Sequence, residues 1–125
     1  MARVLVADDA AFMRRVLRDI IEEAGHEVVQ EATTGEEAVA HYQSSSPDLV
    51  TLDLVMPGEG GQAALKKILE HDPQARVIVV SAVGQKGDVE KALETGAADF
   101  LVKPFEKEAV VQTIDRLLAA VDTRG

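Results

Sequence analysis

The sequence of 125 residues predicts an α/β domain built from five strand–helix units, and two observations carry this prediction. Short apolar runs of strand length alternate along the chain with segments that have helical periodicity. Successive runs are separated by about a dozen residues or more, which is the length that a crossover between parallel strands needs. We therefore expect one parallel sheet with helices on both of its faces.

Four of the apolar runs end directly in polar side chains. The runs at residues 4–7, 49–52, 77–80 and 100–102 are followed by Asp8 and Asp9, Asp53, Ser81 and Lys103, respectively. Because the carboxyl ends of parallel strands meet at one edge of a sheet, these side chains are expected to converge where open α/β sheets bind ligands. A more polar run, around residues 28–29 and ending near residue 32, predicts an edge strand.

Helical patterns follow each run. A stripe of apolar residues at a spacing of four indicates the first helix, with Gly25 behind it as a candidate C-cap. Thr34 and Glu37 form a capping box for the second helix, which residues 44–47 stop. A turn at residues 57–61 precedes the third helix, which ends at residues 72–73, and Gly96 closes the fourth. The apolar helix positions are Phe12, Met13, Val16, Leu17, Ile20 and Ile21; Ala64, Leu65, Ile68 and Leu69; Val89, Ala92 and Leu93; and Val110, Val111, Ile114, Leu117, Leu118 and Val121.

Composition excludes several classes of function. The net charge of −9 argues against electrostatic binding to nucleic acid or to an anionic membrane. The chain has no cysteine, so it has neither disulfides nor a thiolate metal site. No signal peptide is recognisable, and no apolar stretch approaches the ~20 residues that span a bilayer. We expect one cytoplasmic domain over residues 1–125, with a frayed end at residues 122–125 and no output domain.

The adjacent carboxylates of Asp8 and Asp9 suggest a cation site. One of them is able to cap the first helix, which is the ordinary role of an aspartate there. Two neighbouring carboxylates repel each other, however, and oxygen ligands without sulfur or nitrogen suit Mg²⁺. A nucleotide-binding domain would instead have a glycine-rich loop at this point, so that backbone N–H groups face phosphate.

The three other strand ends are compatible with phosphoryl chemistry. Asp53 is either a turn residue or a metal ligand that is also a nucleophile, since carboxylates can attack phosphorus. Ser81 either ends its strand or donates a hydrogen bond to a phosphoryl oxygen. Lys103 precedes Pro104, and a cis peptide between them would turn the ammonium towards the carboxylates.

Together these residues resemble the receiver domain of bacterial two-component response regulators. The resemblance covers residues 3 to about 120 and rests on Asp8-Asp9 with Arg14, Asp53 with Met56-Pro57 and Gly61, Ser81-Ala82, and Lys103-Pro104-Phe105. It implies a flavodoxin-like (βα)₅ fold with strand order 2-1-3-4-5. It also implies that Asp53 is the phosphoacceptor and that Mg²⁺ is the cofactor.

The resemblance assigns a role to each site residue. Asp9 and Asp53 are expected to bind Mg²⁺ directly, Asp8 often through water, and Val55 through its backbone carbonyl. Ser81 and Lys103 are expected to act in phosphoryl transfer. Ser81 and Phe100 are expected to form the switch, with Phe100 at a position where many relatives carry tyrosine. The chain is thus expected to be a phosphoacceptor switch protein that catalyses its own phosphorylation and dephosphorylation, rather than an enzyme with a separate substrate.

The pattern around Ser81 and Lys103 is most similar to stand-alone chemotaxis regulators. This similarity implies a CheA-like sensor histidine kinase as phosphoryl donor, a flagellar motor switch protein or another output protein as target, a phosphatase as a further partner, and a monomeric state. Two alternatives stay open: a single-domain intermediate of a sporulation-type phosphorelay, and a receiver segment of a longer regulator. An aspartyl-phosphate phosphatase of Rossmann-like fold is disfavoured, because it would need a second aspartate two residues after Asp8, where Ala10 stands.

Overall fold

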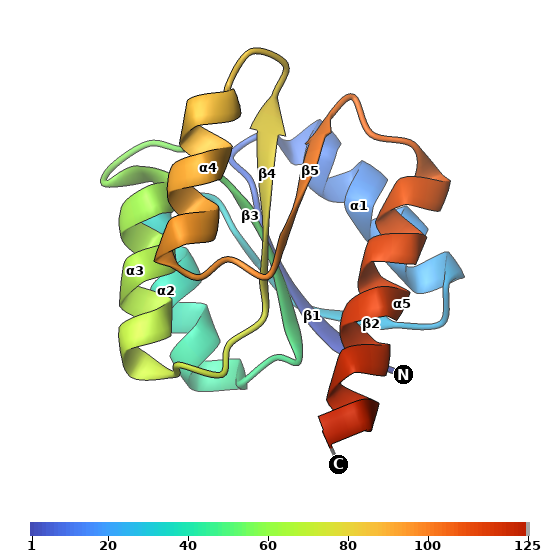
Figure 1. Ribbon diagram of the computed structural model, residues 1–125. Helices are drawn as coiled ribbons and strands as arrows, with labels where there is room; N and C mark the ends of the chain where they lie inside the picture. The colour runs from blue at the N-terminus through green and yellow to red at the C-terminus, as the bar shows by residue number, and fades with distance from the viewer. Residues whose placement is uncertain (125) are drawn as a thin grey trace.

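The computed structural model describes residues 1–124, and their side chains up to residue 119. Strands and helices alternate along the described chain (Figure 1). The strands are β1 (Arg3–Ala7), β2 (Glu27–Ala32), β3 (Leu49–Asp53), β4 (Val77–Ala82) and β5 (Asp99–Lys103). The helices are α1 (Ala11–Glu23), α2 (Gly35–Ser45), α3 (Gly60–His71), α4 (Lys86–Thr95) and α5 (Lys107–Arg124).

The five strands form one parallel sheet in the order β2-β1-β3-β4-β5, which confirms the predicted fold class and strand order. The polar strand β2 lies at an edge, as its sequence predicts. The central strands β1 and β3 are neighbours, with Ala7 paired to Leu52, so the residues that follow them emerge side by side. The helices after these two strands cover opposite faces of the sheet (Figure 1). Such a switch point opens a crevice at the carboxyl edge of the sheet.

The core consists of two apolar layers, one on each face of the sheet. Helices α2, α3 and α4 cover one face, and α1 and α5 cover the other (Figure 1). Successive residues of β1 alternate between the layers: Val4 and Val6 pack with α1 and α5, while Leu5 and Ala7 pack with α2 to α4. Both faces of the strand are therefore buried, which explains its continuously apolar sequence. Each fully buried leucine or isoleucine stabilises this arrangement by roughly 1.5–3 kcal/mol.

Several helix ends follow the sequence signals. Thr34 Oγ1 accepts a hydrogen bond from the backbone N–H of Glu37 (3.1 Å) at the start of α2. The Glu37 carboxylate reaches back one residue further than a standard capping box, to the N–H of Thr33 (2.7 Å). Gly25 and Gly96 follow α1 and α4 with φ of +92° and +129°, conformations that suit glycine.

Three expectations about local structure need correction. Phe12 belongs to the predicted stripe of α1 but is 75% exposed, because it lies in the first turn, whereas the buried residues of this helix are Leu17, Ile20 and Ile21. Gly60 and Gly61 belong to α3 rather than to the preceding turn. The expected frayed end is wrong for residues 122–124, through which α5 continues. Gly125 and the side chain of Val121 lie outside what the structure describes. Among the described residues, no helix is long and apolar enough to span a membrane.

Candidate functional site

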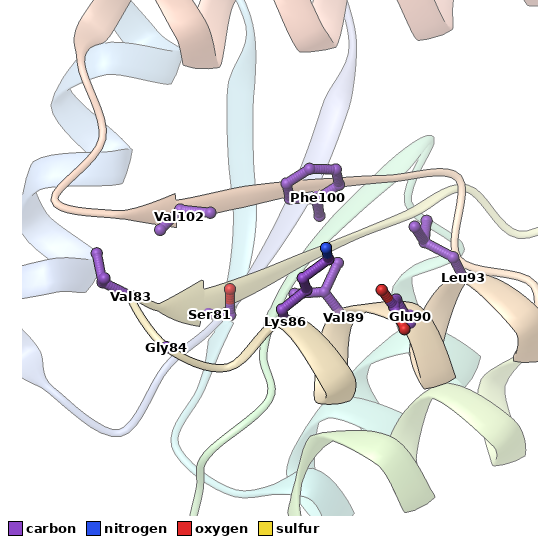
Figure 2. Close-up of a pocket in the computed structure, with 9 residues that line it drawn as sticks. All are labelled: Ser81, Val83, Gly84, Lys86, Val89, Glu90, Leu93, Phe100 and Val102. Carbon is purple, nitrogen blue, oxygen red and sulfur yellow. The ribbon is translucent and has the colours of Figure 1, made fainter.

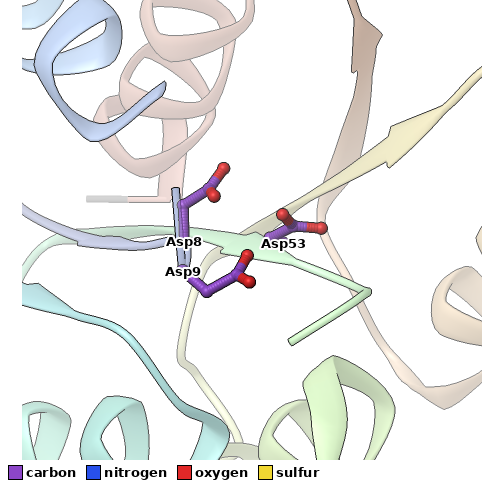
Figure 3. Close-up of side chains that lie close together, drawn as sticks. All are labelled: Asp8, Asp9 and Asp53. Atoms are coloured by element: carbon purple, nitrogen blue, oxygen red, sulfur yellow. The ribbon is translucent and has the colours of Figure 1, made fainter. Parts of the chain in front are cut away.

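Three carboxylates gather at the carboxyl edge of the sheet. Asp8 and Asp9 follow β1, and Asp53 ends the neighbouring strand β3 (Figure 3). One ligand oxygen from each of the three lies within 4.8 Å of the other two. Asp8 and Asp53 are buried, at 1% and 5% exposure, whereas Asp9 is exposed. The sequence predicted this convergence, and the strand order produces it.

Lys103, at the end of β5, reaches the two buried carboxylates. Its Nζ donates a hydrogen bond to Asp53 Oδ2 at 2.9 Å. It also lies 2.9 Å from Asp8 Oδ2, an ion-pair distance without hydrogen-bond geometry. The Lys103–Pro104 peptide is cis. One ammonium thus faces three carboxylates, and the cluster keeps an excess of negative charge.

Burial and charge act differently on the two partners of the central ion pair. Burial is the largest influence on Asp53 and raises the pKa of its carboxyl above the ordinary value, against the opposing effects of the Val55 N–H and Lys103. Burial alone would lower the pKa of Lys103, but the carboxylates of Asp8 and Asp53 outweigh it and raise that pKa. Both pKa values are raised, but for different reasons. Burial prevails at Asp53, whereas the neighbouring carboxylates prevail at Lys103, which is more exposed. Lys103 is therefore firmly charged, while the Asp53 carboxylate is held in an unfavourable ionised state.

Backbone groups orient the two buried carboxylates. The N–H of Val55 donates to Asp53 Oδ1 (2.9 Å), and the N–H of Ala10 donates to Asp8 Oδ1 (2.9 Å). Asp8 thus bonds the residue just before α1, although the N-cap residue itself, Ala10, makes no side-chain cap. These bonds fix one oxygen of each carboxylate and leave the other turned towards Lys103.

The donor set fits a magnesium ion. The cluster offers only oxygen ligands, it carries net negative charge, and the buried oxygen Asp8 Oδ2 has no hydrogen-bond partner among the described residues. Asp8, Asp9 and Asp53 are the candidate ligands. The backbone of Val55, whose side chain is 60% exposed, stands at the same cavity as Asp9 and Asp53.

The two predicted switch residues lie on adjacent strands beside a second cavity. Ser81 ends the buried part of β4, and its Oγ has no hydrogen-bond partner among the described residues. Phe100 on β5 is 41% exposed, and its ring stands over an apolar groove between β5 and α4 (Figure 2). The groove has a volume of about 400 Å³, and Ser81, Val89 and Leu93 also line it. The ring is therefore on the outer side of the groove, with space between it and the helix.

Sequence reasoning missed three residues that support the acidic cluster. Arg14, known only as part of a motif, bonds the backbone of Asp8, and Glu31 on β2 holds Arg14. Gln85 lines the acidic cavity from the start of α4. Glu31 is one of three polar residues in β2, so the strand pattern did not single it out, and the helix pattern gave no signal for Gln85.

The comparisons with known proteins agree with this geometry. A model of the response regulator receiver domain matches residues 4–115. The chain is 50% identical to the chemotaxis protein CheY of Thermotoga maritima, over 92% of this chain and 96% of that one, and 49% identical to CheY of Bacillus subtilis, over 93% and 97%.

Solved structures give the same result. CheY in the CheX–CheY–BeF₃–Mg²⁺ complex from Borrelia burgdorferi is 37% identical and superposes with a TM-score of 0.89, over 93% of this chain and 88% of that one. A two-component response regulator of the LuxR family from Aurantimonas gives a TM-score of 0.90 at 34% identity, over 96% and 86%. The resemblance inferred from the sequence motifs is confirmed, and its similarity to CheY proteins extends over most of the chain. The chain belongs to the response regulator receiver domain family.

Proposed function

We propose that this protein is a phosphorelay signalling switch that accepts a phosphoryl group on Asp53. The observation that carries the proposal is the position of Asp53. It is a buried carboxylate at the end of a central strand, 2.9 Å from the Lys103 ammonium and grouped with two further carboxylates. Membership of the receiver family and the similarity to CheY proteins support it.

The reaction follows from the disposition of charge. A carboxylate oxygen of Asp53 forms a bond to phosphorus, and the bond from phosphorus to the donor's histidine nitrogen breaks, with its electron pair staying on that nitrogen. Lys103 offsets the charge that develops on the phosphoryl oxygens, and the buried hydroxyl of Ser81 is available as a further donor. Dephosphorylation occurs when water attacks phosphorus and the bond from phosphorus to the Asp53 oxygen breaks, which restores the carboxylate.

Magnesium is the cofactor that the acidic cluster would hold, through Asp8, Asp9, Asp53 and the backbone carbonyl of Val55. When bound, it would neutralise the carboxylates and the incoming phosphoryl oxygens. The raised pKa of Asp53 reports the cost of keeping this carboxylate ionised without such a cation.

The signal output is a change at the groove between β5 and α4. Ser81 Oγ would turn towards the phosphoryl group, and Phe100 would turn into the space beside α4. The exposed ring and the cavity of about 400 Å³ beneath it supply the room for this movement. Phosphorylation shifts the balance between the two arrangements by its differential affinity for them.

The similarity to CheY proteins favours chemotaxis as the pathway. We infer a monomeric, cytoplasmic, single receiver domain that is phosphorylated by a CheA-like histidine kinase and acts on a flagellar motor switch protein or another output protein. A sporulation-type phosphorelay intermediate is the competing assignment. Transfer of phosphate from Asp53 back to a histidine phosphotransferase would favour that alternative.

The phosphorylation site is tested by labelling with acetyl phosphate and Mg²⁺, followed by separation of the phosphorylated form. The wild type should be labelled, and Asp53→Asn should not. Asp19→Asn, which changes an exposed aspartate on α1, is the matched control and should be labelled like the wild type. Label that persists in Asp53→Asn would overturn the assignment. Transfer from purified candidate histidine kinases then identifies the donor.

A further inference from the structure

The loop between β4 and α4 is closed by a reciprocal pair of hydrogen bonds between two residues. Gln85 Oε1 accepts a hydrogen bond from the backbone N–H of Ala82 at 2.7 Å. The backbone N–H of Gln85 in turn donates to the carbonyl of Ala82 at 3.3 Å. Gln85 therefore engages both backbone groups of the residue that ends β4.

Both residues face the acidic cavity. Ala82 and Gln85 line a space of about 340 Å³ together with Asp9, Asp53, Val55 and Lys103. Asp53 is paired with Val80 on the neighbouring strand, so Ala82 lies just past the point where β3 ends. A group that is attached to the Asp53 carboxylate has to extend into this space.

The cavity has few hydrogen-bond donors for such a group. A phosphoryl group brings three strong acceptor oxygens and a charge near −2. The N–H of Val55 is already bonded to Asp53 Oδ1, and the ammonium of Lys103 is shared between Asp53 and Asp8. The N–H of Ala82 is a further backbone donor at the cavity, and Gln85 occupies it.

We propose that the side chain of Gln85 is an exchangeable stand-in for the phosphoryl group. On phosphorylation of Asp53, the Ala82 N–H leaves the neutral amide oxygen of Gln85 and bonds an anionic phosphoryl oxygen, which is the stronger acceptor. This inference rests on the proposed function of Asp53. Gln85 competes with the phosphoryl group for one donor and so lowers the site's affinity for it.

The exchange also connects the acidic cavity to α4. Gln85 is the N-cap residue of this helix, and its carbonyl accepts the first helical hydrogen bond, from Val89 at 3.1 Å. Val89 lines the groove beneath Phe100. Phosphorylation of Asp53 thus releases the Gln85 side chain. The same event thereby removes a restraint at the start of α4.

The test is a titration of the full chain with beryllium fluoride at fixed Mg²⁺, followed by ¹⁵N–¹H NMR. Gln85→Ala should bind the phosphoryl mimic about 2- to 10-fold more tightly, because a competing neutral hydrogen bond of ordinary strength is removed. Gln85→Glu should bind it more weakly than the wild type, since a carboxylate holds the Ala82 N–H more firmly and repels the anion. In the wild type, the side-chain NH₂ resonances of Gln85 and the amide of Ala82 should shift on binding.

The matched control is Gln62→Ala. The Gln62 side chain donates to the carbonyl of Asp88 in α4 (2.7 Å) but does not line the acidic cavity, so its loss loosens α4 without freeing the Ala82 N–H. This variant should bind the mimic like the wild type.

The outcomes separate the two proposals. Equal affinity in the wild type, Gln85→Ala and Gln85→Glu would overturn the role of Gln85 and leave Asp53 as the phosphoacceptor. A Gln85→Ala variant that binds more weakly would also overturn it. Undiminished binding to Asp53→Asn, or no binding to the wild type, would overturn the proposed function and this inference with it.

Discussion

Arg14 on α1 holds the backbone of Asp8 in place: its Nη1 donates a hydrogen bond to the Asp8 carbonyl oxygen at 2.9 Å. The same guanidinium donates from Nε to Glu31 Oε1 on β2, also at 2.9 Å. Arg18 adds two hydrogen bonds to the other Glu31 oxygen, at 3.0 and 2.7 Å. The loop that carries Asp8 and Asp9 is therefore fixed from the side by a helix and an edge strand.

The first prediction concerns metal affinity. Arg14→Gln should weaken Mg²⁺ binding about 10-fold or more, because a group that orients metal ligands is removed. Isothermal titration measures the affinity. Arg15→Gln, which breaks only an exposed pair with Asp19, is the control and should bind Mg²⁺ like the wild type. Unchanged affinity in Arg14→Gln would show that the Asp8 loop holds its position without this support.

The second prediction is a pH dependence of stability. Partial burial is the largest single influence on Glu31 and acts to raise its pKa, but the hydrogen bonds from Arg18 and Arg14 prevail and lower the pKa below the ordinary 4.5. The folded protein thus binds this proton less readily than the unfolded chain. The resulting stabilisation is fully present above pH 4.5 and is lost as the pH falls through the lowered pKa.

Glu31→Gln should consequently cost about 1 kcal/mol of unfolding free energy at neutral pH, a value already reduced for the partial exposure of these side chains. The cost should shrink towards zero in acid. Urea unfolding at a series of pH values measures it, with the exposed Glu27→Gln on the same strand as control. A difference between wild type and Glu31→Gln that stays constant with pH would contradict the ion-pair explanation.

The third prediction is that Mg²⁺ stabilises the fold. Three carboxylates against one ammonium cost free energy, which a bound cation recovers by mass action. At 100 times the dissociation constant, the gain is about 2.7 kcal/mol. Thermal melts with and without millimolar Mg²⁺ measure the shift. Asp9→Ala should be more stable than the wild type without Mg²⁺ and should gain less from it, and an equal gain in both would speak against a ligand role for Asp9.

The fourth prediction compares two glycines in helices. A Cβ on Gly61 would lie 2.5 Å from the Cα of Leu54 and closer still to the carbonyl oxygen of Asp53, whereas a Cβ on Gly87 in α4 would meet nothing within 4 Å. Gly61→Ala should therefore destabilise by roughly 1–3 kcal/mol or more, through overpacking against the end of β3. Gly87→Ala should stabilise by up to about 1 kcal/mol, because alanine favours the helix. Chemical denaturation measures both, and equal effects would refute the close approach of α3 to β3.

The fifth prediction concerns the lifetime of the phosphorylated form. Val55 at the acidic cavity and Val83 on the loop after Ala82 are 60% and 78% exposed. Val55 lines the acidic cavity with a branched apolar side chain that cannot orient water, and Val83 offers no polar group nearby either, which lowers the population of water in line for attack. Val55→Asn, alone or with Val83→Glu, should speed the loss of phosphate. Decay of labelled protein after removal of the donor measures the rate, and unchanged or slower decay would show that the valines do not shield the site.

The sequence correctly predicted which polar residues lie at the strand ends, because it shows directly both the apolar runs of strand length and the polar residues that follow them. Once β1, β3, β4 and β5 are neighbours in this order in one parallel sheet, Asp8, Asp53 and Lys103 have to emerge at the same edge. The strand order itself came from the family resemblance, since the apolar pattern of a buried strand is the same in every position of a sheet.

The supporting side chains depend on tertiary placement, which local pattern does not encode. Phe12 fits the helical stripe of α1 but is exposed, because the stripe does not show which turns of the helix pack against the core. Gln85 reaches Ala82 only because the chain turns back directly after β4. The local sequence does not show the direction of that turn. Arg14 and Glu31 meet only because β2 lies beside β1 under α1.

The insertion of β3 between β1 and β4 has a consequence for the protein while it is being made. The Asp8 and Lys103 side chains that meet at Asp53 come from the carboxyl ends of β1 and β5, the first and the last strand of this sheet along the sequence. A nascent chain that stops short of β5 carries all three carboxylates but lacks the ammonium and one of the helices that close the core. Under the proposed function, the charge cluster is thus complete only once β5 has been synthesised, since a shorter chain has no ammonium beside Asp53.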